Sequence, residues 1–140
     1  MRAQSTLDDA DARAAVDAIY EELQARGKTA VIAVVDAHGE LLGLLRVSGT
    51  LLSSMTVATN KAFTAARLRR PSSVVGKRSR DHTTGFDIGY YGDSRYVGWG
   101  GGVPVEREGQ VVGAVGVSGL SESEDEELAQ IGVAAILKRA

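Results

Sequence analysis

Apolar residues recur at helical spacing in three parts of the chain. They predict a first helix capped by Thr6 and ended by Gly27, and a longer helix over residues 50–70, which Pro71 stops. A third helix is predicted near the end of the chain, with a capping box that starts at Ser123. The long helix is apolar around most of its circumference, so we expect it to be packed on both sides.

Continuous apolar and β-branched runs predict strands in two pairs. Residues 29–35 and 40–47 form the first pair, and the second lies within residues 103–117, turning at Glu108-Gly109. Each pair is typical of an antiparallel hairpin that leads into a helix. The pattern therefore predicts one α+β domain over residues 1–140, with an antiparallel sheet built from two hairpins and helices on one face.

The two hairpins also resemble each other in sequence. Residues 35–49 align without gaps onto residues 105–119, with identity at six of the 15 positions. The match indicates either an internal pseudo-repeat or two hairpins that share turn glycines and valines. Gly43 and Gly113 occupy equivalent positions in the middle of a strand, where a glycine predicts the close approach of a helix or a ligand.

The composition excludes several classes of protein. The chain has no cysteine, which excludes a disulfide framework, a thiolate metal site and a cysteine nucleophile. No apolar run approaches the ~18 residues of a membrane span, so we expect no membrane partner. The start of the chain is acidic and polar, unlike a secretory signal, which favours a cytoplasmic protein.

The net charge of −2 hides a strong asymmetry. Residues 41–80 carry eight of the 16 Lys and Arg residues and none of the 18 acidic residues. Such a segment can face nucleic acid, an anionic ligand or the acidic surface of a second subunit, or it can simply be solvated. The pI of about 5.7 disfavours nucleic acid, whereas complementary charged surfaces favour a homo-oligomer.

Lys61 is the first candidate functional residue. On the long helix it lies beside Val57, Ala65 and Leu68, where a charged group is costly unless it is paired. Three interpretations remain open: the side chain snorkels to water, its charge holds an anionic ligand, or a lowered pKa allows acid–base or Schiff-base chemistry. A functional role predicts that Lys61→Met loses function at little cost in stability.

The glycine run that precedes the second hairpin is another candidate. Gly100, Gly101 and Gly102 follow Trp99, and consecutive glycine amides can form an anion-binding nest. The alternative is a flexible loop that merely starts a strand. If the amides face a ligand, a valine at Gly101 or Gly102 is expected to block binding while the protein still folds.

The loop before this run concentrates the aromatic residues of an aromatic-poor chain. Phe86, Tyr90, Tyr91 and Tyr96 precede Trp99 there. This clustering favours a recognition surface, for either a planar ligand or a partner subunit.

Two histidines complete the candidate chemistry. His38 lies in a predicted hairpin turn, where exposure to solvent is expected. His82 follows Asp81 where the basic segment meets the aromatic loop, so it is a weak candidate for a base oriented by Asp81, or for a metal or haem ligand.

Four segments together resemble the GlcG/HbpS-like family, also called the haem-degrading domain family and related to the PduO C-terminal domain. They are Val34–Gly39, Asn60–Ala66, Gly101–Val105 and Val112–Gly119, and the resemblance extends over residues 9–136. It implies a three-layer, profilin-like domain with a central antiparallel sheet. It also implies homo-oligomers and, for some members, binding of haem or corrinoids.

The residues and the resemblance together predict a protein that binds haem, a related tetrapyrrole or a smaller anionic molecule. One alternative is an isomerase or lyase acting on a small carboxylate or carbonyl compound, with Lys61 or His82 as the catalytic group. Another is a structural or regulatory oligomer without a small ligand. The predicted ligand site comprises Asn60, Lys61, Tyr90, Tyr91, Trp99, Gly100, Gly101, Gly102 and Pro104.

Overall fold

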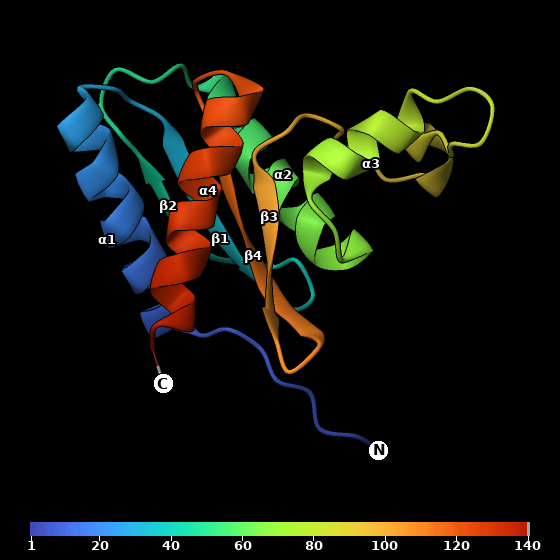
Figure 1. Cartoon of the computed structure of the whole chain (residues 1–140), viewed down its shortest axis with the longest axis horizontal. Coiled ribbons are helices and arrows are strands. Elements are labelled where there is room, and N and C mark those ends of the chain that lie inside the picture. Colours follow the sequence, from blue (N-terminus) through green and yellow to red (C-terminus); the bar gives the residue numbers. More distant parts are fainter. Residues whose placement is uncertain (140) are drawn as a thin grey trace.

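Two β-hairpins lie side by side and form one four-stranded sheet (Figure 1). The computed structural model describes residues 1–139, in which β1 (Val31–Asp36) pairs with β2 (Leu41–Arg46) and β3 (Gly102–Arg107) pairs with β4 (Gln110–Ser118). β1 also pairs with β4, so the strand order is β2-β1-β4-β3 and every pairing is antiparallel. Both predicted hairpins are confirmed.

The helices cover both faces of this sheet. They are α1 (Asp9–Arg26), α2 (Ser53–Leu68), α3 (Ser72–Ser79) and α4 (Glu122–Leu137), and a short 3-10 turn, η1, spans Ile88–Tyr91. In Figure 1, α1 and α4 lie in front of the sheet and α2 behind it. None of the helices within residues 1–139 is long and apolar enough to span a membrane.

Alternating residues of β1 explain the three layers. Ile32 and Val34 pack into the core beneath α1 and α4, whereas Ala33 and Val35 pack against α2. A strand that is apolar at every position is buried on both faces, so helices are needed on both sides of the sheet. The three-layer α+β fold is confirmed, and the prediction from the pattern alone of helices on one face is wrong.

Strand glycines let other elements approach the sheet closely. A Cβ at Gly43 would lie 3.3 Å from Ala12 of α1, as predicted for a helix contact. At Gly113 the neighbour is the N-terminal segment, because a Cβ there would lie 2.5 Å from Leu7. α2 also approaches the sheet closely at Gly116, where a Cβ would lie 2.3 Å from the carbonyl oxygen of Ala58.

The sequence echo between the hairpins does not produce equivalent surroundings. β2 is an edge strand, whereas β4, its counterpart in the alignment, is an interior strand. The helices that follow them, α2 and α4, cover opposite faces of the sheet.

The helix caps differ from those predicted. Asp8, not Thr6, caps α1 through a reciprocal capping box with Asp11, while the Thr6 hydroxyl accepts a hydrogen bond from the amide of Ala37. The cap of α4 is Ser121, two residues before the predicted Ser123. Short polar residues cluster before both helices, and the sequence pattern cannot tell which one takes the cap position.

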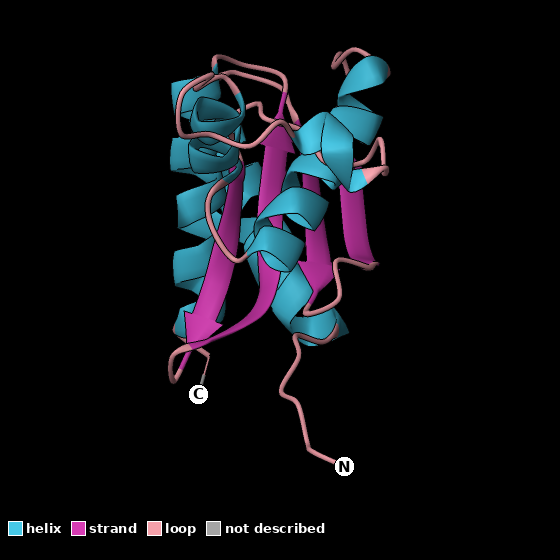
Figure 2. Cartoon of the chain, turned by 90° about the vertical axis from the view of Figure 1, so that its right-hand side faces the viewer, coloured by secondary structure: helices cyan, strands magenta, loops and turns pink. Residues whose placement is uncertain are grey.

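Residues 72–99 form an arm beside the edge strand β3. The arm contains α3 and η1, projects from the body in Figure 1 and faces the viewer in Figure 2. Its base is held by Ser72, whose hydroxyl donates to the carbonyl of Trp99 and accepts from the amide of Gly102. Two backbone segments meet inside the arm, since a Cβ at Gly76 would lie 1.9 Å from the carbonyl oxygen of Gly98.

Candidate functional site

The arm forms an open cavity against the end of α2. This arm pocket has a volume of about 390 Å³, which falls within the range of small-molecule sites. It is lined by Leu68, Arg70, Val75, Arg78, Phe86, Ile88 and Tyr91. Its wall is therefore aliphatic and aromatic, with two guanidinium groups and no carboxylate among the lining residues.

The two arginines give the pocket its charge. Arg70 follows α2, and its Nε donates to the carbonyl of Leu68 over 3.3 Å, while Arg78 lies in the last turn of α3. Neither guanidinium forms an ion pair with a carboxylate of residues 1–139, unlike Arg26, Arg67, Arg95 and Arg139. Unpaired arginines beside apolar surface are suited to bind an anionic group through charge-assisted hydrogen bonds.

A ladder of aromatic rings connects the pocket to the core. Phe63 of α2 is buried, and its ring centroid lies 4.9 Å from that of Tyr96. Tyr96 lies 4.9 Å from Tyr91, which lies 5.2 Å from Phe86. The pocket wall is thus held by a chain of tilted ring contacts that ends at a buried ring of α2. Tyr90 stands apart, 82% exposed, and contacts Phe86 edge-on.

Two cations cover the buried end of this ladder. The guanidinium carbons of Arg67 and Arg95 lie 4.6 and 4.2 Å from the centre of the Phe63 ring. Arg95 also pairs with Asp93 at 2.8 Å, and its hydrogen bonds lower the pKa of Asp93 to about 2. These contacts fix the segment that carries Tyr96, so they help to position the pocket wall.

Lys61 is buried in the structure and does not reach solvent. Its Nζ lies 3.0 Å from Oδ2 of Asp125 and donates to the carbonyl of Val117 over 3.0 Å; only 2% of the residue is exposed. Burial raises the pKa of Asp125, an effect that the charge of Lys61 opposes. The snorkelling interpretation is therefore wrong.

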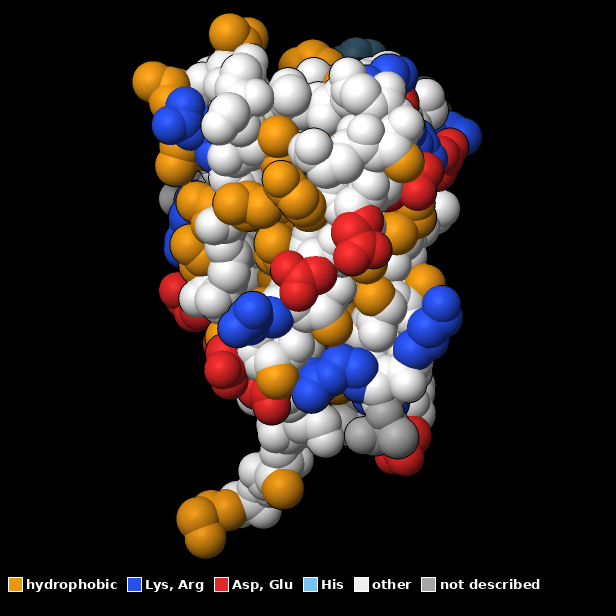
Figure 3. Space-filling view, turned by 90° about the vertical axis from the view of Figure 1, so that its left-hand side faces the viewer, with side chains coloured by type: hydrophobic (Ala, Val, Ile, Leu, Met, Phe, Trp, Pro, Cys, Tyr) orange, Lys and Arg blue, Asp and Glu red, His pale blue; other side chains and the backbone are white. Residues whose placement is uncertain are grey.

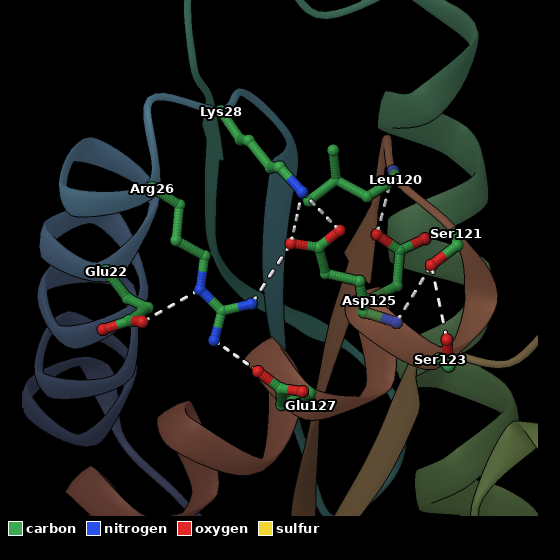
Figure 4. Close-up of polar contacts among 9 residues, drawn as sticks. Glu22, Arg26, Lys28, Leu120, Ser121, Ser123, Asp125 and Glu127 are labelled. Atoms are coloured by element: carbon green, nitrogen blue, oxygen red, sulfur yellow. Dashed lines mark hydrogen bonds and ion pairs between the residues drawn. The ribbon is translucent and has the colours of Figure 1, made fainter.

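The partner of Lys61 is itself fully hydrogen-bonded. The other carboxylate oxygen of Asp125 accepts from the amide of Leu120, two residues before α4 begins (Figure 4). A role for Lys61 in ligand binding or catalysis stays a prediction, and its present partners are all protein groups.

The glycine run is engaged in internal hydrogen bonds. The amide of Gly100 donates to the carboxylate of Glu122, and that of Gly102 donates to the hydroxyl of Ser72. The carbonyl of Gly101 accepts from Val117. Two of the three amides are thus already used, which does not support the expected anion nest.

The other predicted site residues are dispersed. Asn60 is half-buried on α2, and Pro104 lies on the edge strand β3. His82 is exposed in a turn organised by Asp81, and Trp99, 59% exposed, lines a separate cavity of about 190 Å³ beside Ile88. Among residues 1–139, no cluster of three or more His, Asp or Glu side chains could hold a metal ion.

The acidic start of α4 is matched by cations of the same chain. Lys28 and Arg26 both bind Glu124, and Arg26 also binds Glu22 and Glu127. Figure 4 shows Arg26 and Lys28 reaching from the end of α1 and the following turn towards α4. Hydrogen bonds from Lys28 and Arg26 lower the pKa of Glu124. Three of the acidic side chains expected to face a second subunit are therefore paired with cations of their own domain.

Tyr91 is the one predicted site residue that lines the arm pocket. Phe86 belongs to the aromatic cluster that predicts a recognition surface, whereas Leu68, Arg70, Val75, Arg78 and Ile88 were not predicted as site residues. The acid-free basic segment and the aromatic cluster were the signals for them. Only the fold of the arm shows that the two features meet.

The chain is thus a three-layer α+β domain with an apolar pocket that has two arginines in its lining. The family model described as "Haem degrading protein HbpS-like" matches residues 7–134, and the chain belongs to this HbpS-like family. Protein GlcG of Escherichia coli is 34% identical over 118 residues, which cover 84% of this chain and 85% of GlcG.

Solved structures share the whole fold. Klebsiella pneumoniae protein ORFY superposes with a TM-score of 0.94 at 26% identity, covering 100% of this chain and 97% of ORFY. The structure of a PduOC–haem complex superposes with a TM-score of 0.85 at 28% identity, covering 93% of this chain and 94% of that one. The predicted family is therefore confirmed.

Proposed function

We propose that the chain binds haem or a related anionic tetrapyrrole in the arm pocket. The main support for this proposal is the position of Arg70 and Arg78. Both form no ion pair within residues 1–139, and both line the pocket beside its aromatic wall. Family membership and the haem complex of PduOC support the ligand class.

The chemistry of the lining residues fits such a ligand. A tetrapyrrole has a flat apolar macrocycle, which Phe86, Tyr91 and Ile88 can cover by stacking and burial. Its acidic side chains match Arg70 and Arg78. Tyr91 is the lining residue whose phenolate oxygen would bind the iron of a haem, since tyrosinate is a known haem ligand.

The catalytic alternative has less support. The partners of Lys61 are Asp125 and a backbone carbonyl in a sealed interior, and His82 is exposed on the arm. General acid–base catalysis requires a group within hydrogen-bond reach of a substrate, and the arm pocket is lined by neither residue.

Titration with haemin, followed through the Soret band, tests the proposal. The variant Arg70→Gln/Arg78→Gln should bind at least about tenfold more weakly, because each charged hydrogen bond contributes roughly 1.5–3 kcal/mol. The matched control, Arg2→Gln/Arg13→Gln, removes two positive charges elsewhere and should bind like the parent. Equal affinities of the two double variants would contradict the proposed site.

A further inference from the structure

A second, smaller cavity of the arm lies next to the arm pocket. This Trp99 cavity is lined by Gly76, Ser79, Arg80, Ile88, Gly98 and Trp99. Its volume of about 190 Å³ is below the roughly 300 Å³ at which small-molecule sites begin. Ile88 lines both cavities, so the Trp99 cavity is suited to hold one end of a ligand whose other end lies in the arm pocket.

Ile88 and Ser79 form the ridge between the two cavities. The amide of Ile88, at the start of η1, donates to Oγ of Ser79 in α3 over 3.2 Å. The Ser79 hydroxyl itself donates to no acceptor within residues 1–139. Since Ser79 lines the Trp99 cavity, this hydroxyl is available to an oxygen atom of a ligand.

Arg78 and Arg80 lie on opposite flanks of this ridge. Arg80 follows the last residue of α3 in helical conformation, so the side chains of Arg78 and Arg80 point about 200° apart around the helix axis. Ser79 lies between them. Arg78 lines the arm pocket and Arg80 lines the Trp99 cavity, so each cavity has its own guanidinium group.

The charge of Arg80 is not balanced within the described part of the chain. Arg80 forms no ion pair with a carboxylate of residues 1–139, whereas Arg26 and Arg139, on the side of α1, both do. Figure 3 shows that side of the molecule, where Lys and Arg side chains lie among Asp and Glu. In the Trp99 cavity, the guanidinium of Arg80 accompanies an indole ring that is 59% exposed. This pair of groups fits a planar ring that carries an acidic substituent.

We infer that the arm binds a tetrapyrrole with acidic groups on more than one edge, and that the macrocycle lies across Ile88. One acidic edge then meets Arg70 and Arg78 in the arm pocket, and another meets Arg80 in the Trp99 cavity. A porphyrin with acidic groups on one edge alone uses only one of these two charged ends. The inference rests on the proposed function, and it adds the distribution of acidic groups that the site selects.

Metal-free coproporphyrin and protoporphyrin are matched probes of this selection. They share the macrocycle, and neither has an iron atom to coordinate. Coproporphyrin carries a propionate on every pyrrole ring, whereas the propionates of protoporphyrin lie on two neighbouring rings. Titration followed through porphyrin fluorescence should show that the parent binds coproporphyrin at least about fivefold more tightly, because only coproporphyrin reaches both charged ends.

The variant Arg80→Gln tests the contribution of the Trp99 cavity. It should weaken coproporphyrin binding about tenfold and leave protoporphyrin binding unchanged, because only the former places an acidic group beside Arg80. Lys77→Gln is the matched control, since Lys77 is an exposed cation of the same helix that lines neither cavity. This control should bind both porphyrins like the parent.

The outcomes separate this inference from the proposed function. Equal affinities of the parent for the two porphyrins would overturn the inference. So would an Arg80→Gln variant that binds coproporphyrin as tightly as Lys77→Gln does. In both cases the arm pocket can still bind protoporphyrin through Arg70 and Arg78. If Arg70→Gln/Arg78→Gln binds protoporphyrin like the parent, or if neither porphyrin binds, the proposed function is contradicted and the inference is overturned with it.

Discussion

Lys61 of α2 and Asp125 of α4 join the two helical layers at one end of the sheet. Their charged atoms lie 3.0 Å apart, and both side chains are almost fully buried. The contact passes beside Gly101, where a Cβ would lie 2.9 Å from Nζ of Lys61. The absence of a side chain at this position therefore makes room for the ion pair.

Breaking this pair should destabilise the fold without touching the arm pocket. Lys61→Met leaves the Asp125 carboxylate buried and unpaired, which should lower the unfolding free energy by about 3–5 kcal/mol. This reverses the expectation that the same substitution costs little stability. Urea unfolding of Lys61→Met measures the effect.

The double variant Lys61→Met/Asp125→Asn provides the control. Replacing both charged groups with neutral ones removes the uncompensated charge, and the asparagine oxygen still accepts from the amide of Leu120, so most of the lost stability should return. A Lys61→Met variant as stable as the parent would refute the structural role assigned to the pair.

Gly102 should tolerate no larger side chain. A Cβ at this position would lie 2.1 Å from the carbonyl oxygen of Lys61, which is backbone and cannot move away cheaply. Gly102→Val should therefore unfold or severely destabilise the domain, rather than leave a folded protein that fails to bind. Thermal unfolding of the purified variant measures the effect.

The variant Gly109→Ala measures the cost of backbone strain alone, without the steric overlap expected in Gly102→Val. Gly109 has a φ of 76°, but a Cβ there meets nothing within 4 Å. Its substitution should cost only about 1 kcal/mol, the usual price of a left-handed conformation for a residue with a side chain. A Gly102→Val variant that is as stable as Gly109→Ala would contradict the packing described.

Acidification should weaken the contact between Asp93 and Arg95 in a narrow pH range. The folded pKa of about 2 lies below the ordinary value of 3.8, so the ionised carboxylate favours the folded state. Its contribution is complete above about pH 4 and is lost as the pH falls through 2. Burial raises the pKa of Asp125, so the protonation of this carboxyl group affects the free energy of unfolding with the opposite sign. Its contribution to the free energy of unfolding is complete below pH 3.8 and declines as the pH rises through the folded pKa.

Asp93→Asn isolates the first of these effects. The difference in unfolding free energy between parent and variant should grow from pH 2 to pH 4 and then stay constant. A difference that is the same at pH 2 and pH 5 would show that Asp93 is not stabilised in its ionised form.

The fold was predictable because its signals are local. Apolar runs and turn residues mark both hairpins, and the continuous apolar character of β1 follows directly from its burial on two faces. The site was not predictable in the same way. Lys61 and Asp125 are 64 residues apart, and no local pattern shows that a lysine on one helix has its counter-ion on another. A lysine among apolar neighbours indicates a functional role because a buried charge is costly. The structure shows that the ion pair with Asp125 offsets that cost.

The arm pocket needed tertiary information for a different reason. Arg70 and Phe86 are 16 positions apart, on segments without a common period, and only the fold of the arm brings them to one cavity. The aromatic cluster indicated a recognition surface. It did not show that Tyr91 lines the cavity and that Tyr90 does not.

Removal of the Phe86 ring should weaken ligand binding more than removal of the Tyr90 ring. Phe86 lines the cavity. Tyr90 does not line it and only contacts the ring of Phe86 edge-on. Phe86→Ala should reduce haemin affinity roughly two- to twelvefold, as expected for losing about 0.5–1.5 kcal/mol of aromatic contact. Fluorescence quenching of Trp99 by haemin provides the measurement. A larger loss in Tyr90→Ala would place the ligand outside the arm pocket.

Chemical-shift mapping with zinc protoporphyrin, a diamagnetic analogue of haem, tests the position of the ligand most directly. The amide signals of Arg70, residues 75–78 and residues 86–91 should shift on titration, because these segments line the arm pocket. The signals of Lys61 and residues 100–102 should stay in place. Shifts concentrated at Lys61 and residues 100–102, with none in the arm, would contradict the account.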